Sequence, residues 1–115
     1  PTIISYFSTS CAPCIPGLKA LTEINDSDIN VYLIAIDHKK AAVKMFLKKH
    51  GVKADGVVLD KFTKLAQRHG VANENQKANI PKTFLINKDG IVKTIYLSEG
   101  LDFKEHIKEQ MKQID

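Results

Sequence analysis

The stretch Ile3-Ile-Ser-Tyr-Phe-Ser-Thr-Ser-Cys-Ala-Pro-Cys14 decides how this chain of 115 residues folds. Its first part, Ile3 to Phe7, is rich in β-branched and aromatic residues, which is typical of a buried strand. Residues 8–10 are of types that cap helices. Apolar residues then follow at helical spacing, at Leu18, Leu21 and Ile24. The sequence therefore predicts that the two cysteines lie where a strand ends and a helix begins.

Strands and helices alternate along the rest of the chain. The apolar run Val31–Ile36 is predicted to be a parallel strand covered on both faces, which makes the first three elements a right-handed βαβ unit. The later elements are expected to be a helix with apolar residues from 42 to 47 that stops at Gly51, a strand at 57–59, a short helix around Phe62, Leu65 and Ala66, and a polar loop at 71–79. The pattern ends with two strands at 83–86 and 91–96, which are joined by a hairpin turn at 87–90. A last helix is expected at 103–113, with Asp102 and Glu105 at its start.

This order predicts one α/β domain over residues 1–115, with a central mixed β-sheet flanked by helices on both faces. The composition, 43% hydrophobic and 26% charged, is ordinary for a globular protein, and no apolar run is long enough to span a membrane. The net charge of +4 is spread along the chain without a concentrated basic patch. We therefore expect no nucleic-acid partner, no membrane contact by the domain itself and a monomer, with a mild preference for acidic partners.

The two cysteines, Cys11 and Cys14, are too close in sequence to form a stabilising disulfide framework, and the chain lacks the four ligands of a structural zinc site. A thiolate at Cys11 would be stabilised by the amino end of the helix. Cys14, one turn further, is expected to be more buried and to resolve a mixed disulfide formed at Cys11. Pro13 suits the first helical turn, whereas Pro16 is expected to remove one early hydrogen bond and bend the start of the helix. The pair predicts thiol–disulfide exchange without a metal or a cofactor.

At these residues the chain resembles the thioredoxin superfamily. The segment Ile3–Cys14 is similar to the strand and active-site motif of that family, and Ile80-Pro-Lys-Thr-Phe84 is similar to its cis-proline loop and following strand. The spacing, together with the segment Val57–Asp60 and its short helix, looks most like the TlpA-type branch, which includes the ResA and CcmG proteins. The resemblance implies a thioredoxin fold with a TlpA-type βα insertion.

The resemblance also implies roles for single residues. Cys11 would be the nucleophile and Cys14 its partner, and Pro81 would be cis and lie against the cysteine pair. Ile80 would offer backbone hydrogen bonds to an extended substrate segment, and Ala12 and Pro13 would contact the same substrate. The chain departs from the family at three positions: Ser10 replaces a tryptophan, and Ser5 and Gly17 stand where thioredoxins and ResA-type proteins, respectively, carry an acid.

The leading functional hypothesis is a thiol–disulfide oxidoreductase that acts on the thiols and disulfides of a partner protein, and the Ala-Pro dipeptide favours a reductase. The alternatives are a disulfide oxidase or isomerase, a non-catalytic thioredoxin-like module, and a copper carrier in which His38 would have to assist the cysteines. Asp37 and His38 are otherwise expected to form a solvated loop, Tyr6 and Phe7 to pack in the core, and His50, His69 and His106 to lie on helix surfaces. The resemblance implies an extracytoplasmic bacterial protein, often tethered to the membrane by a segment that is not in this sequence, with a cytoplasmic location left open.

Overall fold

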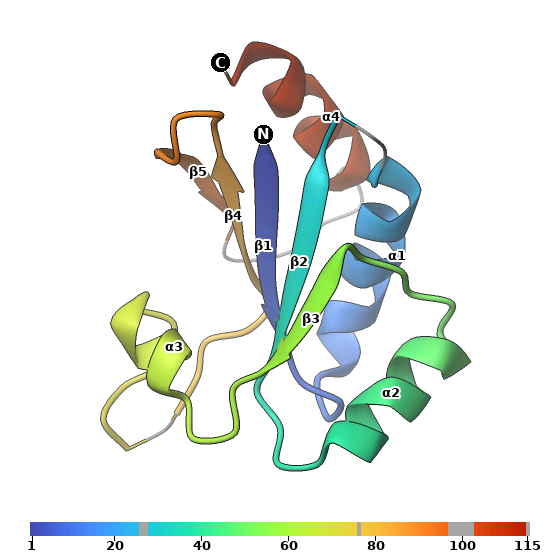
Figure 1. Ribbon diagram of the computed structural model, residues 1–115, viewed down its shortest axis with the longest axis vertical. Coiled ribbons are helices and arrows are strands. Elements are labelled where there is room, and N and C mark those ends of the chain that lie inside the picture. Colours follow the sequence, from blue (N-terminus) through green and yellow to red (C-terminus); the bar gives the residue numbers. More distant parts are fainter. Residues whose placement is uncertain (26–27, 76, 97–102, 115) are drawn as a thin grey trace.

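Five strands form one mixed sheet in the order β3-β2-β1-β4-β5 (Figure 1). This computed structural model describes residues 1–25, 28–75, 77–96 and 103–114. Strand β1 pairs in parallel with β2 and antiparallel with β4, so it occupies the centre of the sheet. The expected element order and the mixed sheet are confirmed.

The elements have the following bounds along the chain: β1 Thr2–Phe7, the 3-10 helix η1 Ala12–Cys14, α1 Ile15–Ile24, β2 Asn30–Ala35, α2 Lys40–Lys49, β3 Gly56–Leu59, α3 Lys64–Arg68, β4 Lys82–Ile86, β5 Val92–Tyr96 and α4 Phe103–Gln113. The turn between β4 and β5 is the predicted hairpin. There Asn87 Oδ1 accepts hydrogen bonds from the Asp89 and Ile91 N–H groups, and Gly90 has a φ of 82°, a value that favours glycine.

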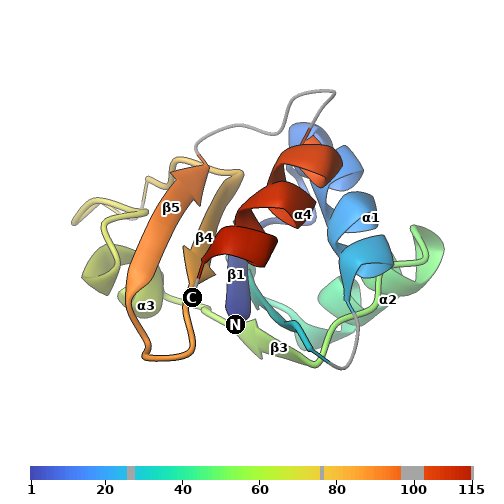
Figure 2. The same cartoon turned by 90° about the horizontal axis from the view of Figure 1, so that it is seen from above.

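One face of the sheet carries the larger hydrophobic core. Helices α1, α2 and α4 lie on this face, as the view along the sheet shows (Figure 2). Alternate residues of β1 and β2 point into this core, because side chains in a strand alternate between the two faces. The fully buried members of the core include Ile3, Phe7, Leu33 and Ile107. Cys14 belongs to the same core, so one sulfur of the pair is set among apolar side chains.

The opposite face has a smaller cluster beneath α3. It consists of Tyr6, Ile34, Ala66, Val71 and Phe84. Beyond the reach of this five-residue helix the face is open to solvent, and Tyr32, Val58, Val92 and Ile95 are exposed on the strands. Helices therefore flank both faces as expected, but the cover on the second face is partial.

One local expectation needs correction. Phe62 was expected to pack from a helix with Leu65 and Ala66, but α3 begins only at Lys64, and the Phe62 ring is 57% exposed. Pro16 lies in the first turn of α1, where a missing N–H costs little, and a bend at this point stays a prediction. The expected cap at Asp102 lies outside the described residues.

Candidate active site

The loop that follows β1 carries the first cysteine. Two of its N–H groups are bound within the loop: the Cys11 N–H donates to the Ser8 carbonyl oxygen at 3.0 Å, and the Ser10 N–H donates to Ser8 Oγ at 3.2 Å. Ser8 Oγ also shares a hydrogen bond of 2.9 Å with Ser10 Oγ. The serines therefore do not cap the helix as predicted. They hold the loop in shape, and Cys11 itself occupies the cap position before η1, with no side-chain cap.

Asp37 fixes this loop to the end of β2. Its carboxylate accepts hydrogen bonds from the Thr9 N–H at 3.0 Å and from the Thr9 hydroxyl at 2.7 Å. The Ile36 N–H donates to the Phe7 carbonyl oxygen at 2.8 Å, which extends the pairing of β1 and β2 up to this point. Asp37 is therefore a structural partner of the cysteine loop, and the expectation of a solvated Asp37–His38 pair holds only for His38, whose side chain is exposed.

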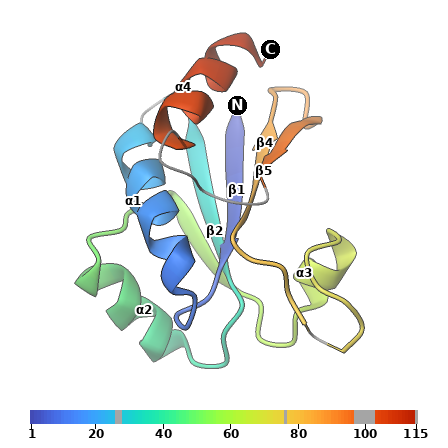
Figure 3. The same ribbon diagram turned by 180° about the vertical axis from the view of Figure 1, so that it is seen from behind.

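Cys11 and Cys14 form a disulfide across the single turn of η1. The segment between β1 and α1 that carries them lies at the lower end of the sheet in Figure 3. Their Cα atoms are 5.4 Å apart, within the usual range for disulfides. Cys14 is 1% exposed, whereas Cys11 is only partly buried and the intervening Ala12 and Pro13 are exposed. A partner can therefore approach Cys11 past Ala12 and Pro13, while Cys14 is reached only through Cys11.

The segment before β4 reaches the same end of the sheet. Lys82, the first residue of β4, lies opposite Tyr6 near the end of β1, so Ile80 and Pro81 come just beyond the sheet on the side of the cysteine loop. The Ile80–Pro81 peptide bond is cis, as the resemblance implied. Pro81 is buried, and the partly buried Ile80 packs against the core that contains Cys14. Contact between Pro81 and the sulfurs remains a prediction.

A pair of hydroxyl groups is buried in the sheet on the face of the cysteine core. Ser5 and Thr83 are opposite each other in the β1–β4 register, both 0% exposed, and their hydroxyl oxygens share a hydrogen bond of 2.9 Å. Ser5 stands where thioredoxins carry an acid, so this position is polar but uncharged. The sequence drew attention to Ser5 alone, because the register that brings Thr83 to it joins residues 78 positions apart.

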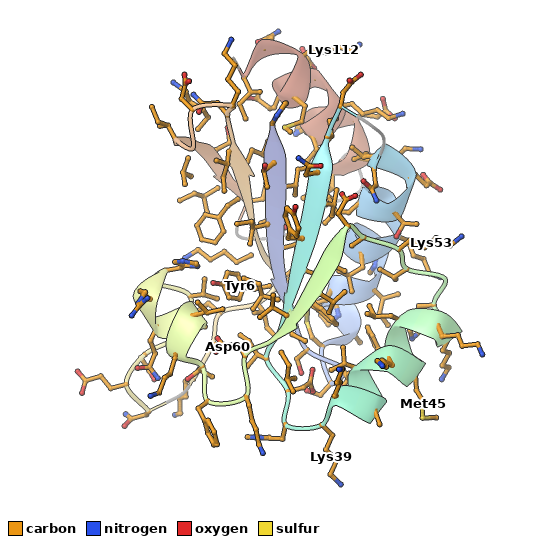
Figure 4. The ribbon with its side chains drawn as sticks, viewed as in Figure 1. Tyr6, Lys39, Met45, Lys53, Asp60 and Lys112 are labelled. Atoms are coloured by element: carbon orange, nitrogen blue, oxygen red, sulfur yellow. A yellow bond between two sulfur atoms is a disulfide. The ribbon has the colours of Figure 1, made fainter. Side chains whose placement is uncertain are left out.

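On the other face, Tyr6 has polar partners that the sequence did not reveal. Its hydroxyl is hydrogen-bonded to His69 Nδ1, at the end of α3. Burial, and secondarily the negative charge of Asp60, raise the pKa of Tyr6 to about 12. Asp60 in turn accepts hydrogen bonds from the Leu65 and Ala66 N–H groups at the start of α3. Figure 4 shows Tyr6 and Asp60 at the lower end of the sheet, on the side of α3.

Among the described residues, no group of three or more His, Cys, Asp or Glu side chains could hold a metal ion. The copper hypothesis therefore finds no third ligand in this part of the chain, and it rests on the two cysteines alone.

None of the described helices is long and apolar enough to cross a membrane. His50, predicted to lie on a helix surface, is half-buried, and its ring packs against Phe46 with the centroids 4.7 Å apart.

A mixed sheet with a cysteine pair after its central strand and a cis-proline at the same end defines a thioredoxin-fold protein. The chain belongs to the AhpC/TSA family, which matches residues 1–95. The similarity to ResA-type proteins expected from the sequence is confirmed by a curated relative, the thiol-disulfide oxidoreductase ResA of Geobacillus thermodenitrificans, which is 25% identical over 96% of this chain. The chain spans 61% of the length of that relative.

Solved structures share the fold. A structure described as a thiol:disulfide interchange protein DsbE from Chlorobium tepidum superposes with a TM-score of 0.79 at 20% identity, covering 97% of this chain and 77% of its own. A secreted Mycobacterium tuberculosis disulfide oxidoreductase, homologous to E. coli DsbE, superposes with a TM-score of 0.76 at 13% identity, covering 97% and 80%. At these identities the similarity establishes the thioredoxin fold.

Proposed function

We propose that this domain is a thiol–disulfide oxidoreductase that exchanges disulfides with protein substrates and works mainly as a reductase. The observation that carries the proposal is the unequal exposure of the pair: Cys14 is 1% exposed, while Cys11 is partly accessible beside the exposed Ala12 and Pro13. Disulfide exchange by two steps needs one sulfur that meets the partner and one that meets only the first sulfur. The name of the ResA relative supports the same activity.

In the proposed reaction, the Cys11 thiolate attacks a substrate disulfide. A Cys11–substrate disulfide forms, the substrate S–S bond breaks, and one substrate sulfur leaves as a thiolate that takes up a proton. Cys14, after losing its proton, attacks Cys11 Sγ, which forms the Cys11–Cys14 disulfide and releases the second substrate thiol. Two electrons pass from the domain to the substrate, and the protons lost by the cysteines are balanced by those gained by the substrate thiols.

The surroundings of the pair support specific roles. The helix dipole at the amino end of η1 and α1 would favour the anionic form of Cys11, because it stabilises negative charge there. The substrate would reach Cys11 along a path lined by Ala12, Pro13, Ile80 and Pro81. The backbone of Ile80 would pair with an extended substrate segment. An extracytoplasmic location is proposed as well, supported by the secreted mycobacterial structural neighbour.

The proposal is tested by turbidimetric reduction of insulin with dithiothreitol as the electron donor. The wild-type chain should accelerate precipitation over dithiothreitol alone, and Cys11→Ser should remove the acceleration completely. Cys14→Ser should lose turnover. Reduced Cys14→Ser that is mixed with insulin after removal of dithiothreitol should form a mixed disulfide, visible by non-reducing electrophoresis. Acceleration by Cys11→Ser equal to that of the wild type would refute the proposal. A strongly oxidising reduction potential of the pair, measured against glutathione, would favour the oxidase instead.

A further inference from the structure

The two edge strands of the sheet are protected to different degrees. Strand β5 carries a lysine, Lys93, and its register with β4 is irregular, and both features discourage pairing with another chain. Strand β3 has the sequence Gly-Val-Val-Leu, with no charge and no proline, and Val57 and Val58 are 43% and 45% exposed. An edge strand with none of the usual protection either promotes aggregation or serves as a binding surface.

The outer side of β3 has backbone groups available for pairing. The Asp60 N–H, just after β3, donates to the Ala35 carbonyl oxygen at 2.8 Å, toward β2. Because successive backbone groups of a strand point to opposite sides, the N–H and C=O groups of Val57 and Leu59 point away from β2, in agreement with the register that pairs them with Leu33 and Ala35. In the part of the sheet that the structure describes, β3 is the last strand on this side (Figure 1).

A groove runs beside this edge, between β3 and α2. It has a volume of about 410 Å³, within the range of about 300–1,000 Å³ that is common for ligand sites. Its walls are apolar, with two lysines at the side of α2, and the lining residues are Lys40, Val43, Lys44, Leu47, Val57 and Leu59. The apolar residues would receive side chains that an added strand turns toward α2.

The charged side chains that line the groove are both lysines, Lys40 and Lys44. Helix α2 reads Lys-Ala-Ala-Val-Lys-Met-Phe-Leu-Lys-Lys, so it holds four lysines and no acid. The described residues form one ion pair, Lys104 with Glu23, which joins α4 to α1 and leaves the lysines of α2 without an acidic partner. Figure 4 shows Lys39 directed away from the domain just before α2, and Met45 on the outer side of this helix. The rim of the groove is therefore an unneutralised basic surface.

From these three features we infer that the β3 edge and the α2 groove form a docking site for an extended segment of a partner protein whose side chains on one face are apolar and acidic in turn. The segment adds a sixth strand beside β3 and turns this face toward α2, so that its apolar side chains contact Val43, Leu47 and Val57 and its carboxylates meet Lys40 and Lys44. A second copy of this chain fits poorly, because pairing of β3 with β3 would bring two lysine-rich α2 helices together. The inference goes beyond disulfide exchange, since binding here requires neither cysteine.

The test uses the oxidised full chain and a fluorescein-labelled eight-residue peptide, the Glu-Val peptide, in which every second residue is Ser and the residues between them are Val and Glu in turn. Fluorescence anisotropy should show saturable binding that weakens as salt is raised, and the amide signals of residues 56–59 and 40–47 should shift in NMR spectra. The double variant Lys40→Glu/Lys44→Glu should raise the Kd by about tenfold. The matched control Lys48→Glu/Lys49→Glu changes the same helix by the same charge outside the groove, and it should change the Kd by less than about threefold.

Two further peptides complete the design. A Lys-Val peptide, with Lys in place of each Glu, should not bind. A Glu-Val peptide with N-methyl groups on alternate backbone nitrogens should bind at least about tenfold more weakly, since it cannot pair with β3. Equal binding of the Lys-Val peptide, equal binding of the N-methylated peptide, or unshifted signals at 56–59 with 1 mM Glu-Val peptide would overturn the inference. A dimer of the chain alone that Val58→Lys dissociates would assign the edge to a second copy and would overturn it too.

Discussion

Asp37→Ala removes both hydrogen bonds that hold the cysteine loop to β2. Asp37 accepts from the Thr9 N–H at 3.0 Å and from the Thr9 hydroxyl at 2.7 Å. A hydrogen bond to a charged group contributes about 1.5–3 kcal/mol, and partial exposure of Asp37 lowers this contribution. We therefore expect Asp37→Ala to lower the free energy of unfolding of the oxidised protein by about 2–3 kcal/mol in urea titrations. Thr9→Val, which removes only the hydroxyl, should cost about 1 kcal/mol.

The double variant distinguishes a direct interaction from two separate effects. If Asp37 binds the Thr9 hydroxyl, Thr9→Val should cost almost nothing once Asp37 is alanine, which gives a coupling energy of about 1 kcal/mol. The same variants should make Cys14 react faster with iodoacetamide in the reduced protein, because the loop that leads to η1 is no longer held to β2. The assigned role of Asp37 would be refuted if the double variant lost the sum of the two single losses and if the reactivity of Cys14 were unchanged.

Three further predictions concern the core and the polar pairs. Ile107→Ala, at a fully buried position, should lower the free energy of unfolding by about 2–4 kcal/mol, whereas Ile91→Ala, at a 54% exposed position, should change it by less than about 0.5 kcal/mol, both by urea titration. Ser5→Ala should cost about 1–2 kcal/mol by the same measurement, since it breaks the buried hydrogen bond to Thr83. Because the pKa of Tyr6 is raised to about 12, its protonated form stabilises the fold fully below pH 10, and this contribution is lost as the pH rises through 12. Tyr6→Phe should therefore lose less stability than the wild type between pH 10 and 12, and parallel losses would contradict this assignment.

The order of the elements could be predicted from the sequence because each depends on local patterns. The alternating strand Ile3–Phe7, the helical spacing of Leu18, Leu21 and Ile24, and the turn at 87–90 each indicate their structure within about ten residues. The cysteine pair could be placed at a strand–helix junction for the same reason. The error at Phe62 arose where a short apolar pattern fits either a helix or a turn, and the structure places this ring in solvent.

The contacts around the site could not be predicted, because they join distant parts of the chain. Thr9 and Asp37 are 28 residues apart, and Tyr6 and His69 are 63 apart. Such pairs depend on the order of strands in the sheet and on the exact register, and a shift of one residue would turn each side chain to the other face. The family resemblance supplied one long-range element, the cis bond before Pro81, because the motif at 80–84 carries it.

The central claim is that the two sulfurs differ: Cys11 is the accessible, anionic one and Cys14 is covered. The most direct measurement is the rate of alkylation of each cysteine in the reduced protein, followed by mass spectrometry of peptides between pH 5 and 10. Modification should occur first at Cys11, with a rate that rises with an apparent pKa below the ordinary thiol value of about 8.5. Faster modification of Cys14, or an apparent pKa of Cys11 at or above the ordinary value, would contradict the account.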